Sequence, residues 1–374
     1  MKVSLLQENL AKGVLMVERM VANKAQLPVL SNILLVTEMG KLKISATNLE
    51  TGMNLWISSK VEKPGKITIP AKVLLELVSS LPKDTVILET EGERLKVVCG
   101  KFKAIINGIL AEEFPEVPSL KGGSKKGVES LIIKTDILES CVDQVAMAAG
   151  IDEARPIFTG VKWEISKDIK LAATDGYRLS VKKIKGVKWV GDLKEMVVPA
   201  RALMELTKII SKVDDEEVLI AVTDKDKQLI LALKDVEVVT RLIEGEFPDF
   251  EKIVPKSSST TIEFDKEELT QAVRAAAIFA RDSANIVKFK VIDSNLLISA
   301  NAPQVGENEV KVSILQKGED TEIAFNSRYL LEILSLIKAE RLTLSMSGPL
   351  SPGVFKEVPD KDFLHIIMPV RVQG

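Results

Sequence analysis

The chain has 374 residues, which is more than a domain with a single hydrophobic core usually contains. This length suggests two or three domains. Its residues are 46% hydrophobic but only 4% aromatic, which indicates a globular protein built on Leu, Ile and Val and excludes a disordered chain. The formal net charge is −2, whereas a protein that holds DNA by neutralising phosphates usually has a basic surplus, so any hold on DNA must rest mainly on something other than salt-sensitive affinity.

The first residues, Met1-Lys-Val-Ser-Leu-Leu-Gln-Glu, carry charges where a signal peptide has its apolar core. No later stretch approaches the roughly 18 uninterrupted apolar residues of a membrane span. We therefore expect a cytoplasmic protein with no membrane partner. Cys99 and Cys141 are too few for a disulfide framework or a complete zinc site, and their apolar surroundings favour core positions.

Three helical patterns recur along the chain, each with apolar residues three or four positions apart. This spacing predicts a helix with one face on the core. The three sets are Leu10, Val14, Val17 and Val21; Leu138, Val142, Val145 and Ala149; and Leu269, Val273, Ala276 and Ala280.

Each pattern is followed by a strand that ends in a small turn. The copies span residues 42–52, 170–179 and 296–301. Thr47, Thr174 and Asn301 hold the same place in them and are 127 residues apart. The chain is therefore predicted to contain three repeated domains, because this period is far longer than the 20–50 residues of a solenoid repeat.

A short strand that feeds a second helix follows in each repeat, at residues 69–78, 198–207 and 325–334. Pro70 and Pro199 stand at the head of the first two copies, where proline suits a helix entry. Apolar residues recur at i, i+1, i+4 and i+5, which predicts one stripe packed inward. In the first copy this stripe is Val73, Leu74, Leu77 and Val78.

The remaining segments complete the prediction of an α+β fold. Residues 86–90 and 218–222 are typical of antiparallel strands, and Gly- or Ser-rich linkers stand at 119–127 and 255–260. Glu113-Phe-Pro-Glu116 closes the first repeat as Glu246-Phe-Pro-Asp249 closes the second. The chain is predicted to have three tandem domains, 1–120, 128–254 and 259–374, each with two helices packed on antiparallel sheet.

The sequence carries no recognisable set of catalytic residues. His365, the only histidine, lies in an apolar run that predicts a buried strand position rather than a general base. Residues 122–127 lack the order of a phosphate-binding loop. The acidic runs 214–217 and 224–226 favour solvated turns over a metal site. We expect no catalytic residue, no metal and no cofactor.

Four segments in the right order resemble the beta subunit of bacterial DNA polymerase III, the beta sliding clamp family, along essentially the whole chain. They are residues 173–179, 247–255, the Phe325-Asn opening of the last helix, and Met368-Pro-Val-Arg371. The resemblance implies a non-enzymatic processivity factor, two subunits of which join head to tail as a ring. Each domain would give two helices to the inner wall, so the chain would form half of the ring.

The resemblance also implies the partners. A closed ring holds duplex DNA topologically and without sequence specificity, which suits a nearly neutral chain. The replicative polymerase catalytic subunit, the clamp loader and other proteins with a clamp-binding peptide motif would dock on it. Candidate DNA-facing cations, each of which is equally well read as an ordinary solvated side chain, are Lys24, Lys72, Arg201, Lys208, Arg274 and Arg328. Asp136, Glu139 and Asp143 make the first helix of the second repeat acidic, against a uniformly basic bore.

In the family the peptide motif docks in a cleft between the second and third domains. A hairpin turn at Asp175-Gly176 and a core position for Met368 are the alternative readings of this region, and Tyr177 stands where many members carry His. The matching positions are Phe158, Thr174, Gly176, Tyr177, Arg178, Leu179, Pro248, Ile253, Pro352, Ile366, Met368, Pro369, Val370 and Arg371.

Ring closure in the family pairs the first domain of one subunit with the third domain of the other. Ile278 and Phe279 match apolar interface positions, and Ile106 is a possible counterpart on an edge strand. Ordinary helix core is the alternative for the first two. Two other functions stay open: a repeat-built adaptor that binds peptides without encircling DNA, and an enzyme with an unrecognised site.

Overall fold

The computed structural model describes residues 1–22, 27–121, 128–223, 227–360 and 362–371. Helices alternate with antiparallel strands, so the predicted α+β class is confirmed. Within these ranges no helix is long and apolar enough to cross a membrane. The chain divides into two compact units: unit 1 holds Met1–Thr135, Trp189–Asp192 and Lys208–Leu242, and unit 2 holds Asp136–Lys188, Leu193–Thr207 and Ile243–Gly374.

Unit 1 contains two antiparallel sheets. The first has, in spatial order, β5 (Lys60–Lys63), β1 (Lys2–Leu6), β7 (Thr85–Glu91), β8 (Arg94–Cys99) and β9 (Phe102–Asn107). The second has β10 (Glu129–Lys134), β15 (Glu217–Thr223), β16 (Gln228–Ala232), β17 (Val236–Arg241), β4 (Thr51–Ser58), β3 (Lys41–Thr47), β2 (Asn32–Glu38) and β6 (Lys66–Pro70).

Unit 2 also contains two antiparallel sheets. The larger has β14 (Glu195–Pro199), β11 (Gly160–Ile165), β12 (Ile169–Thr174), β13 (Arg178–Ile184), β26 (Phe363–Ile367), β25 (Gly353–Val358), β24 (Arg341–Met346), β18 (Thr260–Asp265) and β22 (Leu315–Gly318). The smaller has β21 (Gly306–Ser313), β20 (Asn295–Ala302), β19 (Ile286–Ile292) and β23 (Thr321–Asn326).

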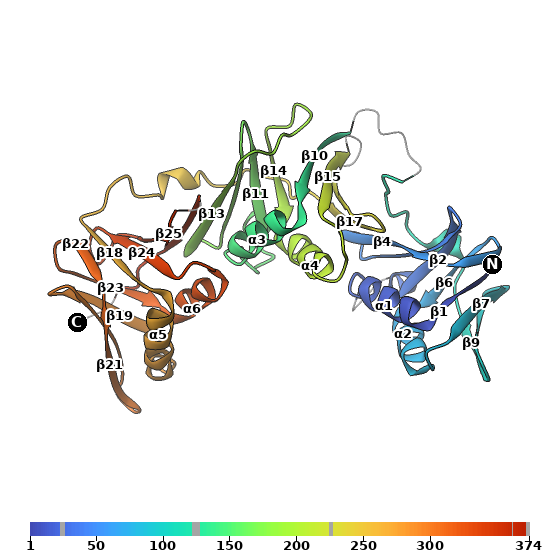
Figure 1. The fold of residues 1–374 in the computed structure, drawn as a ribbon, viewed down its shortest axis with the longest axis horizontal. Helices are drawn as coiled ribbons and strands as arrows, with labels where there is room; N and C mark the ends of the chain where they lie inside the picture. Colours follow the sequence, from blue (N-terminus) through green and yellow to red (C-terminus); the bar gives the residue numbers. More distant parts are fainter. Residues whose placement is uncertain (23–26, 122–127, 224–226, 361, 372–374) are drawn as a thin grey trace. The chain divides into compact units, whose positions relative to one another are not determined.

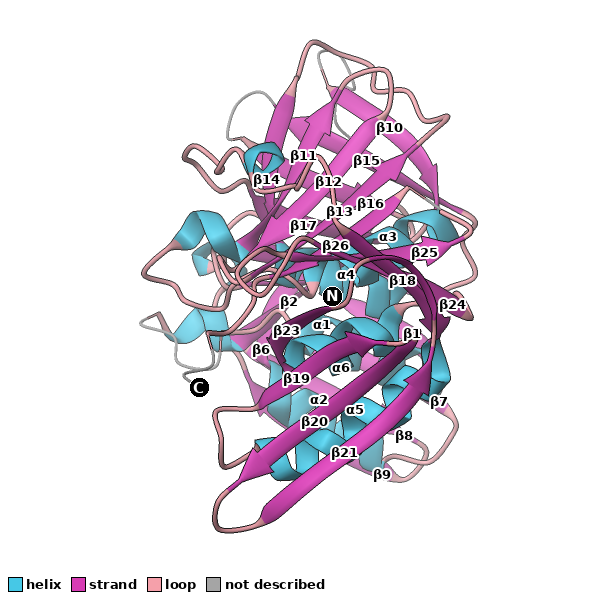
Figure 2. Ribbon diagram, turned by 90° about the vertical axis from the view of Figure 1, so that its left-hand side faces the viewer, coloured by secondary structure: helices cyan, strands magenta, loops and turns pink. Residues whose placement is uncertain are grey.

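The helices arise where the sequence predicts them. They are α1 (Gln7–Glu18), α2 (Ala71–Ser80), α3 (Thr135–Ala146), α4 (Ala200–Ile210), α5 (Lys266–Ala280) and α6 (Ser327–Leu336), with 3-10 turns η1 (Pro28–Ser31), η2 (Ala111–Glu113), η3 (Pro156–Thr159) and η4 (Phe250–Lys252). The side chains of Asp265 and Asn326 cap α5 and α6 by accepting a backbone N–H from Glu268 and Arg328. In Figures 1 and 2, α5 lies against the sheet of β19, β20 and β21 and beside α6.

The apolar pattern of the first helix in each repeat is buried except at Val21, which is half-buried. Two patterns run past their helices, because α1 ends at Glu18 and α3 at Ala146. Val21 and Ala149 therefore lie in the turns that follow. Cys99 and Cys141 are free thiols in the core, as predicted.

One position of the second helical pattern was predicted wrongly. Val73 on α2 is 48% exposed rather than packed inward. The buried residues of this helix are Ala71, Leu74 and Val78. At about 100° per residue, Val73 points roughly 130° away from the middle of that buried face, and Leu77 lies half-buried at its margin.

Both large sheets run across predicted domain limits. In unit 1, β4 of the first repeat pairs with β17 of the second. In unit 2, β13 of the second repeat pairs with β26 of the third. The second repeat thus gives half of its strands to each unit, which is why three sequence repeats form two compact units. The limits 1–120, 128–254 and 259–374 remain predictions.

The core of unit 2 around α5 and α6 includes three phenylalanines, the middle one of which, Phe325, contacts the other two. The rings of Phe289 and Phe325 meet edge to face with centroids 5.5 Å apart, and Phe355 lies 5.9 Å from Phe325. All three are fully buried. Aromatic packing of this kind adds to the stability that the buried area gives, so the third repeat offers a rigid support for β25 and β26.

Candidate functional site

The residues matched to a peptide cleft gather where β13 meets β26. Leu179 stands opposite Ile366 in this antiparallel pair. Just beyond the last pair, the backbone N–H of Met368 donates to the carbonyl oxygen of Tyr177 over 2.8 Å. We call this junction the β13–β26 seam. It fixes Tyr177 and Met368, from two different repeats, next to each other.

The turn that leads into the seam is closed by side chains. The hydroxyl of Thr174 donates to the carbonyl oxygen of Arg178 over 2.6 Å and accepts from the N–H of Gly176. Asp175 Oδ1 accepts from the N–H groups of Tyr177 and Arg178. Gly176 has φ +93°, a conformation that favours glycine. Residues 174–178 therefore form a hairpin turn, and this turn presents Tyr177 to solvent.

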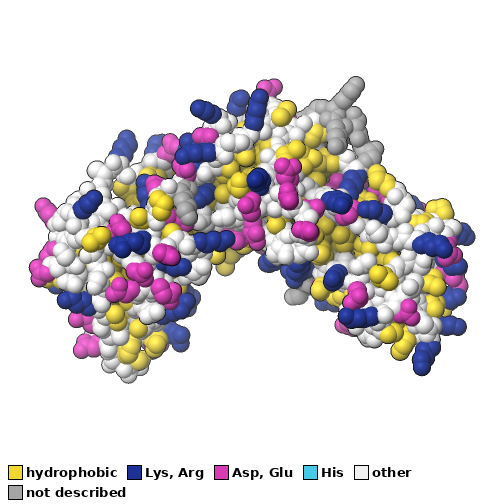
Figure 3. All heavy atoms as spheres, in the orientation of Figure 1, with side chains coloured by type: hydrophobic (Ala, Val, Ile, Leu, Met, Phe, Trp, Pro, Cys, Tyr) yellow, Lys and Arg dark blue, Asp and Glu magenta, His cyan; other side chains and the backbone are white. Residues whose placement is uncertain are grey.

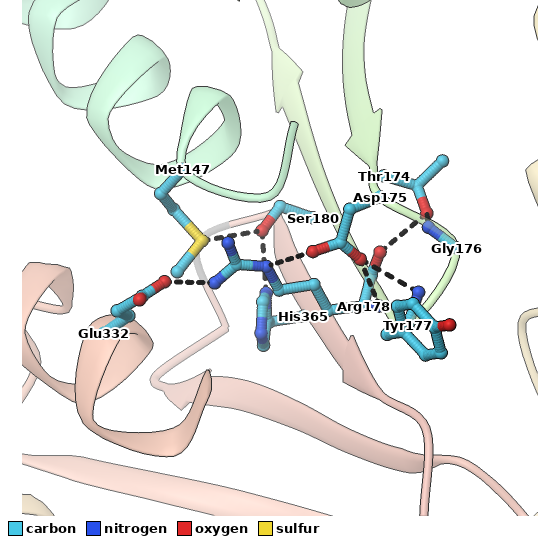
Figure 4. A network of polar contacts seen from close by, with 9 residues as sticks. All are labelled: Met147, Thr174, Asp175, Gly176, Tyr177, Arg178, Ser180, Glu332 and His365. Atoms are coloured by element: carbon cyan, nitrogen blue, oxygen red, sulfur yellow. Dashed lines mark hydrogen bonds and ion pairs between the residues drawn. The ribbon is translucent and has the colours of Figure 1, made fainter. Parts of the chain in front are cut away.

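Arg178 ties the turn to the third repeat, as Figure 4 shows. Its Nε donates to Asp175 Oδ2 over 3.0 Å, and its Nη1 pairs with Glu332 on α6. Its guanidinium also lies 4.6 Å from the ring centre of Tyr329. A planar fork with charged partners on two sides holds one geometry, so Arg178 fixes the position of the turn on α6.

A buried apolar cluster lies beneath the seam. We call it the seam cluster, and its members are Ala172, Leu179, Val197, Phe247, Phe250, Val354 and Ile366. The ring centres of Phe247 and Phe250 are 6.3 Å apart, edge to face. Leu179 and Ile366 are almost fully buried, so they support the surface and do not form it. The seam thus has an apolar floor that is already packed.

Three apolar side chains stand exposed at the seam or beside it. Tyr177 is 62% exposed, Ile253 is 40% and Met368 is 37%. Met368 is therefore a surface residue and not a core residue. Exposed apolar side chains over a rigid apolar floor are suited to bind an apolar peptide side chain.

The other matched residues lie at the ends of the same elements. Phe158 is half-buried in η3, with the guanidinium of Arg155 5.1 Å from its ring centre. The N–H of Val370 donates to the carbonyl oxygen of Ala324 over 2.8 Å, which anchors the C-terminal segment on β23. Pro248, Pro352 and Pro369 are half-buried and Arg371 is exposed.

Sequence reasoning missed several residues of this region. Phe247 and Phe250 lie in the segment 247–255 that carries part of the family resemblance, but nothing in their spacing indicated that both enter the seam cluster. Ile151 is 97% exposed in a loop whose Gly150 donates its N–H to the carbonyl oxygen of Phe158. An isoleucine within the polar run Ile151-Asp-Glu-Ala-Arg155 was the available signal. No sequence signal pointed to Glu332, because its partner Arg178 is remote in sequence.

His365 is buried on β26, as predicted, and is not arranged as a base. Its Nδ1 lies 2.7 Å from the hydroxyl oxygen of Ser180, which also lies 3.8 Å from the sulfur of Met147 (Figure 4). Burial, together with the charge of Arg178, lowers the pKa of His365 to about 3. A histidine that stays neutral and enclosed at neutral pH is a structural side chain.

The candidate DNA-facing cations lie on helix surfaces. Lys72 on α2, Arg201 and Lys208 on α4, Arg274 on α5 and Arg328 on α6 are exposed, whereas Lys24 falls outside the described residues. Figure 3 shows Lys and Arg side chains interspersed with Asp and Glu over the visible face, in keeping with the small net charge.

Helix α3 carries the acidic side chains that the sequence predicts for it, Asp136, Glu139 and Asp143. Burial and the neighbouring charge of Glu139 raise the pKa of Asp143. In the described ranges, no group of acidic, cysteine or histidine side chains is arranged to hold a metal ion. The run 214–217 lies at and before the start of β15, and 224–226 lies outside the described residues.

The candidate interface residues differ in exposure. Ile278 on α5 is 57% exposed, and Phe279 is half-buried against the core of unit 2. Ile106 does lie on an edge strand, β9, but its side chain is buried. The exposed apolar residues of that strand are Phe102 and Ile105.

A repeated α+β chain with a packed apolar seam, whose only histidine is buried and neutral, has the features of a binding and scaffolding protein. Comparison with known families makes this specific. Models of the DNA polymerase III beta subunit match the chain as its N-terminal domain at residues 1–118, its central domain at 132–249 and its C-terminal domain at 251–371.

Individual relatives agree with the family models over their whole length. The beta sliding clamp of Bacillus subtilis is 28% identical and matches 99% of this chain and 100% of its own. That of Synechococcus elongatus is 29% identical over both whole chains. The crystal structure of the beta subunit from DNA polymerase of Streptococcus pyogenes has a TM-score of 0.92 at 25% identity, and covers 100% of each chain.

This chain belongs to the DNA polymerase III beta subunit family, the beta sliding clamps. It is therefore a processivity factor of DNA replication rather than an enzyme, as the resemblance implied. The three-domain clamp fold is confirmed with it.

Proposed function

We propose that two copies of this chain close head to tail into a ring around duplex DNA, and that the β13–β26 seam tethers the replicative polymerase to it. The observation that carries the tethering is the exposure of Tyr177, Ile253 and Met368 over the seam cluster. A ring needs no strong attraction to phosphates, which agrees with a net charge of −2.

The occupant of the seam would be a short, partly apolar peptide. Met368 adapts its unbranched side chain to different partners, while Arg178 holds the turn that carries Tyr177. The floor is packed before binding, so little side-chain ordering would oppose association. The clamp loader and other proteins that carry the same kind of peptide would compete for this place, in the cytoplasm.

The helix cations would face the DNA. Arg201, Arg274 and Arg328 are exposed on α4, α5 and α6, one helix of the second repeat and both of the third. Contacts from such side chains to phosphates position a duplex without reading its sequence. The acidic residues of α3 would leave the bore only locally basic, so that DNA is held loosely and slides.

Two sheet edges support the head-to-tail dimer. β9 ends its sheet in unit 1 and β21 ends its sheet in unit 2, and strands at such edges can pair with another chain. Lys101 and Lys103 are exposed at the β9 edge, and Glu307 and Glu309 at the β21 edge. These opposite charges would set the register of two copies.

Apolar side chains flank both edges. Phe102 and Ile105 are exposed on β9, and Ile278 is exposed on α5. A hollow of about 730 Å³ lies beside β21 and is lined in part by Ser283 and Asn301. Stable interfaces usually combine an apolar core with a polar rim, and the exposed apolar side chains could supply that core.

Retention on nicked circular DNA at high salt, after loading with the cognate clamp loader and ATP, tests the proposal. We expect the protein to stay on the circle and to be lost once the circle is cut at one site. Equal retention on both forms, with a loader that is active on a known clamp, would contradict encirclement and favour a peptide-binding adaptor.

A further inference from the structure

The seam between the second and third repeats has a counterpart between the first and second, wholly within unit 1. β4 pairs with β17 there, and Gly52 stands opposite Val239. The backbone N–H of Arg241 donates to the carbonyl oxygen of Glu50 over 3.0 Å. In unit 2 the backbone N–H of Met368 makes the corresponding bond to the carbonyl oxygen of Tyr177. We call the new junction the β4–β17 seam.

The turn before this seam repeats the side-chain bonds of residues 174–178. The hydroxyl of Thr47 donates to the carbonyl oxygen of Thr51 over 3.0 Å. Asn48 Oδ1 accepts from the N–H groups of Glu50 and Thr51, as Asp175 does in unit 2. Two turns with the same bonds, 127 residues apart, allow the two seams to be compared position by position.

The chemistry at matching positions differs. Gly52 replaces Leu179, and the side chain of Val117 covers it. Arg241 takes the place of Met368. A cavity of about 150 Å³ lies at the β4–β17 seam, lined by Thr47, Leu49, Gly52, Gln228, Val239 and Arg241 among others.

A segment of the chain walls this cavity and is firmly held. The Asn54 side-chain amide donates to the carbonyl oxygen of Pro118 over 2.9 Å, and Glu237 Oε1 accepts the N–H of Leu120 over 3.1 Å. Val117 lies across Gly52, with a methyl carbon 2.9 Å from where a Cβ would stand. The wall is thus built into the fold, and the space beside it is a formed cavity.

Hydrogen-bond acceptors predominate around the cavity. Gln228 Oε1 is buried and has no hydrogen-bond partner among the described residues. Glu50 and Glu116 place two exposed carboxylates on the lining, against one guanidinium from Arg241. A buried acceptor without a donor is costly, and the charged lining residues sum to −1. An occupant should therefore bring hydrogen-bond donors and positive charge.

We propose that the β4–β17 seam is a second peptide site, which takes a lysine side chain from an extended segment of a partner protein. At about 30 Å³ per water molecule the cavity has room for roughly five waters, as many as the heavy atoms of a lysine side chain. The aliphatic stem packs between Leu49, Val117 and Val239, in the way that lysine stems cover apolar surface. The ammonium group faces the carboxylates of Glu50 and Glu116 on the lining, beside the Gln228 side chain.

This site has a different preference from the β13–β26 seam and does not depend on it. The first seam offers apolar side chains over a packed floor, whereas the second offers a cavity lined by hydrogen-bond acceptors. A ring of two copies would then carry two kinds of docking place. A partner could present an apolar segment to one and a basic segment to the other, which would raise its residence without tightening either contact.

The test is the binding of acetyl-Gly-Leu-Lys-Leu-Gly-amide to the full chain by titration calorimetry. Its control has norleucine in place of lysine. We expect the lysine peptide to bind at least about tenfold more tightly, since several charge-assisted bonds are lost with norleucine. No binding of the lysine peptide up to about 1 mM, or equal binding of both peptides, would overturn the proposal.

Variants locate the site. The double change Glu50→Gln with Glu116→Gln should weaken the lysine peptide by about tenfold. The matched control, Glu76→Gln with Glu93→Gln, removes two exposed carboxylates from unit 1 outside the seam and should leave affinity unchanged. Met368→Ala should also leave it unchanged. Loss of binding in Met368→Ala, or equal loss in both double variants, would show that the peptide binds elsewhere and would contradict the assignment.

Discussion

The backbone N–H of Met368 donates a 2.8 Å hydrogen bond to the carbonyl oxygen of Tyr177. This bond joins the last strand of the third repeat to the turn of the second. It leaves both side chains on the surface, where Tyr177 is 62% and Met368 37% exposed. The site is thus fixed by the backbone and lined by side chains that remain free to adapt.

Replacing Met368 by Ala should weaken binding of a clamp-motif peptide by about tenfold or more, because a buried thioether side chain contributes roughly 1.5–3 kcal/mol at an interface. Fluorescence anisotropy with a labelled peptide measures it. Met204→Ala is the matched control, since Met204 on α4 is exposed to the same degree, 38%. Affinity within about threefold of the parent would contradict the assignment of Met368.

The change Leu179→Ala is a poorer test of the same site. Leu179 is only 2% exposed and belongs to the seam cluster. Its truncation should cost about 2–5 kcal/mol of stability through the cavity it leaves. A loss of peptide binding in that variant, alone or combined with Met368→Ala, would therefore not separate a lost contact from a disturbed fold.

Arg178 should prove more sensitive than its partner Glu332. Arg178→Lys removes the fork that reaches Asp175 and Glu332 together, and we expect a fall in peptide affinity of about tenfold as the turn loosens. Glu332→Gln keeps the bond to Asp175 and should stay within about threefold, because half-exposed ion pairs contribute little. The opposite order of effects, measured with the same labelled peptide, would show that the turn is held by α6 instead.

Local pattern was enough to predict the helices. The positions of α1, α3 and α5 follow from a 3.6-residue period that each segment carries by itself. The turn at 174–178 likewise follows from short-range chemistry. The repeat interval of 127 residues then indicated repeated domains and not the short units of a solenoid. These features need no knowledge of what lies across the sheet.

Features set by remote pairing were not predicted. The family resemblance implies sheets that are continuous across repeats, but nothing near β4 or β13 indicates that their partners are β17 and β26. Which face of β9 is buried depends on its partner β8, and this hid the burial of Ile106. The exposure of Val73 was missed for the same reason. A broad apolar stripe on a helix does not determine which edge of the stripe the neighbouring helix covers.

His365 should make the protein less stable in acid. Its pKa is lowered to about 3 in the fold, while the unfolded chain titrates near 6.5. Between these values the unfolded state binds one more proton, so the free energy of unfolding falls by about 1.4 kcal/mol for each pH unit below 6.5. Above pH 6.5 both states are neutral and the contribution is constant.

The imidazole can be followed directly, because His365 is the only histidine. Its ring signals in NMR should not titrate between pH 8 and 5 while the fold persists. His365→Gln should lose the extra acid sensitivity, with equal pH dependence in the two proteins above pH 7. A ring signal that titrates with a midpoint near 6.5 in the folded protein would show that the residue is open to water.

The dimer depends on exposed apolar side chains, and Ile278 offers the cleanest test. Its side chain is 57% exposed on α5, so Ile278→Asp should leave the subunit folded and place a charge in the interface. We expect monomers by light scattering, because an unpaired buried charge costs several kcal/mol. The double change Ile278→Ala with Phe279→Ala is less selective, since Phe279 packs partly on the core of unit 2.

Ile132→Asp is the control for this experiment. Ile132 on β10 is also 57% exposed, but lies in unit 1 away from β9. It should keep the mass of the parent, so a loss of mass confined to Ile278→Asp identifies the α5 surface as the interface. An unchanged mass in both variants would show that these exposed side chains do not hold the ring together, and the charged edges of β9 and β21 would then have to do so.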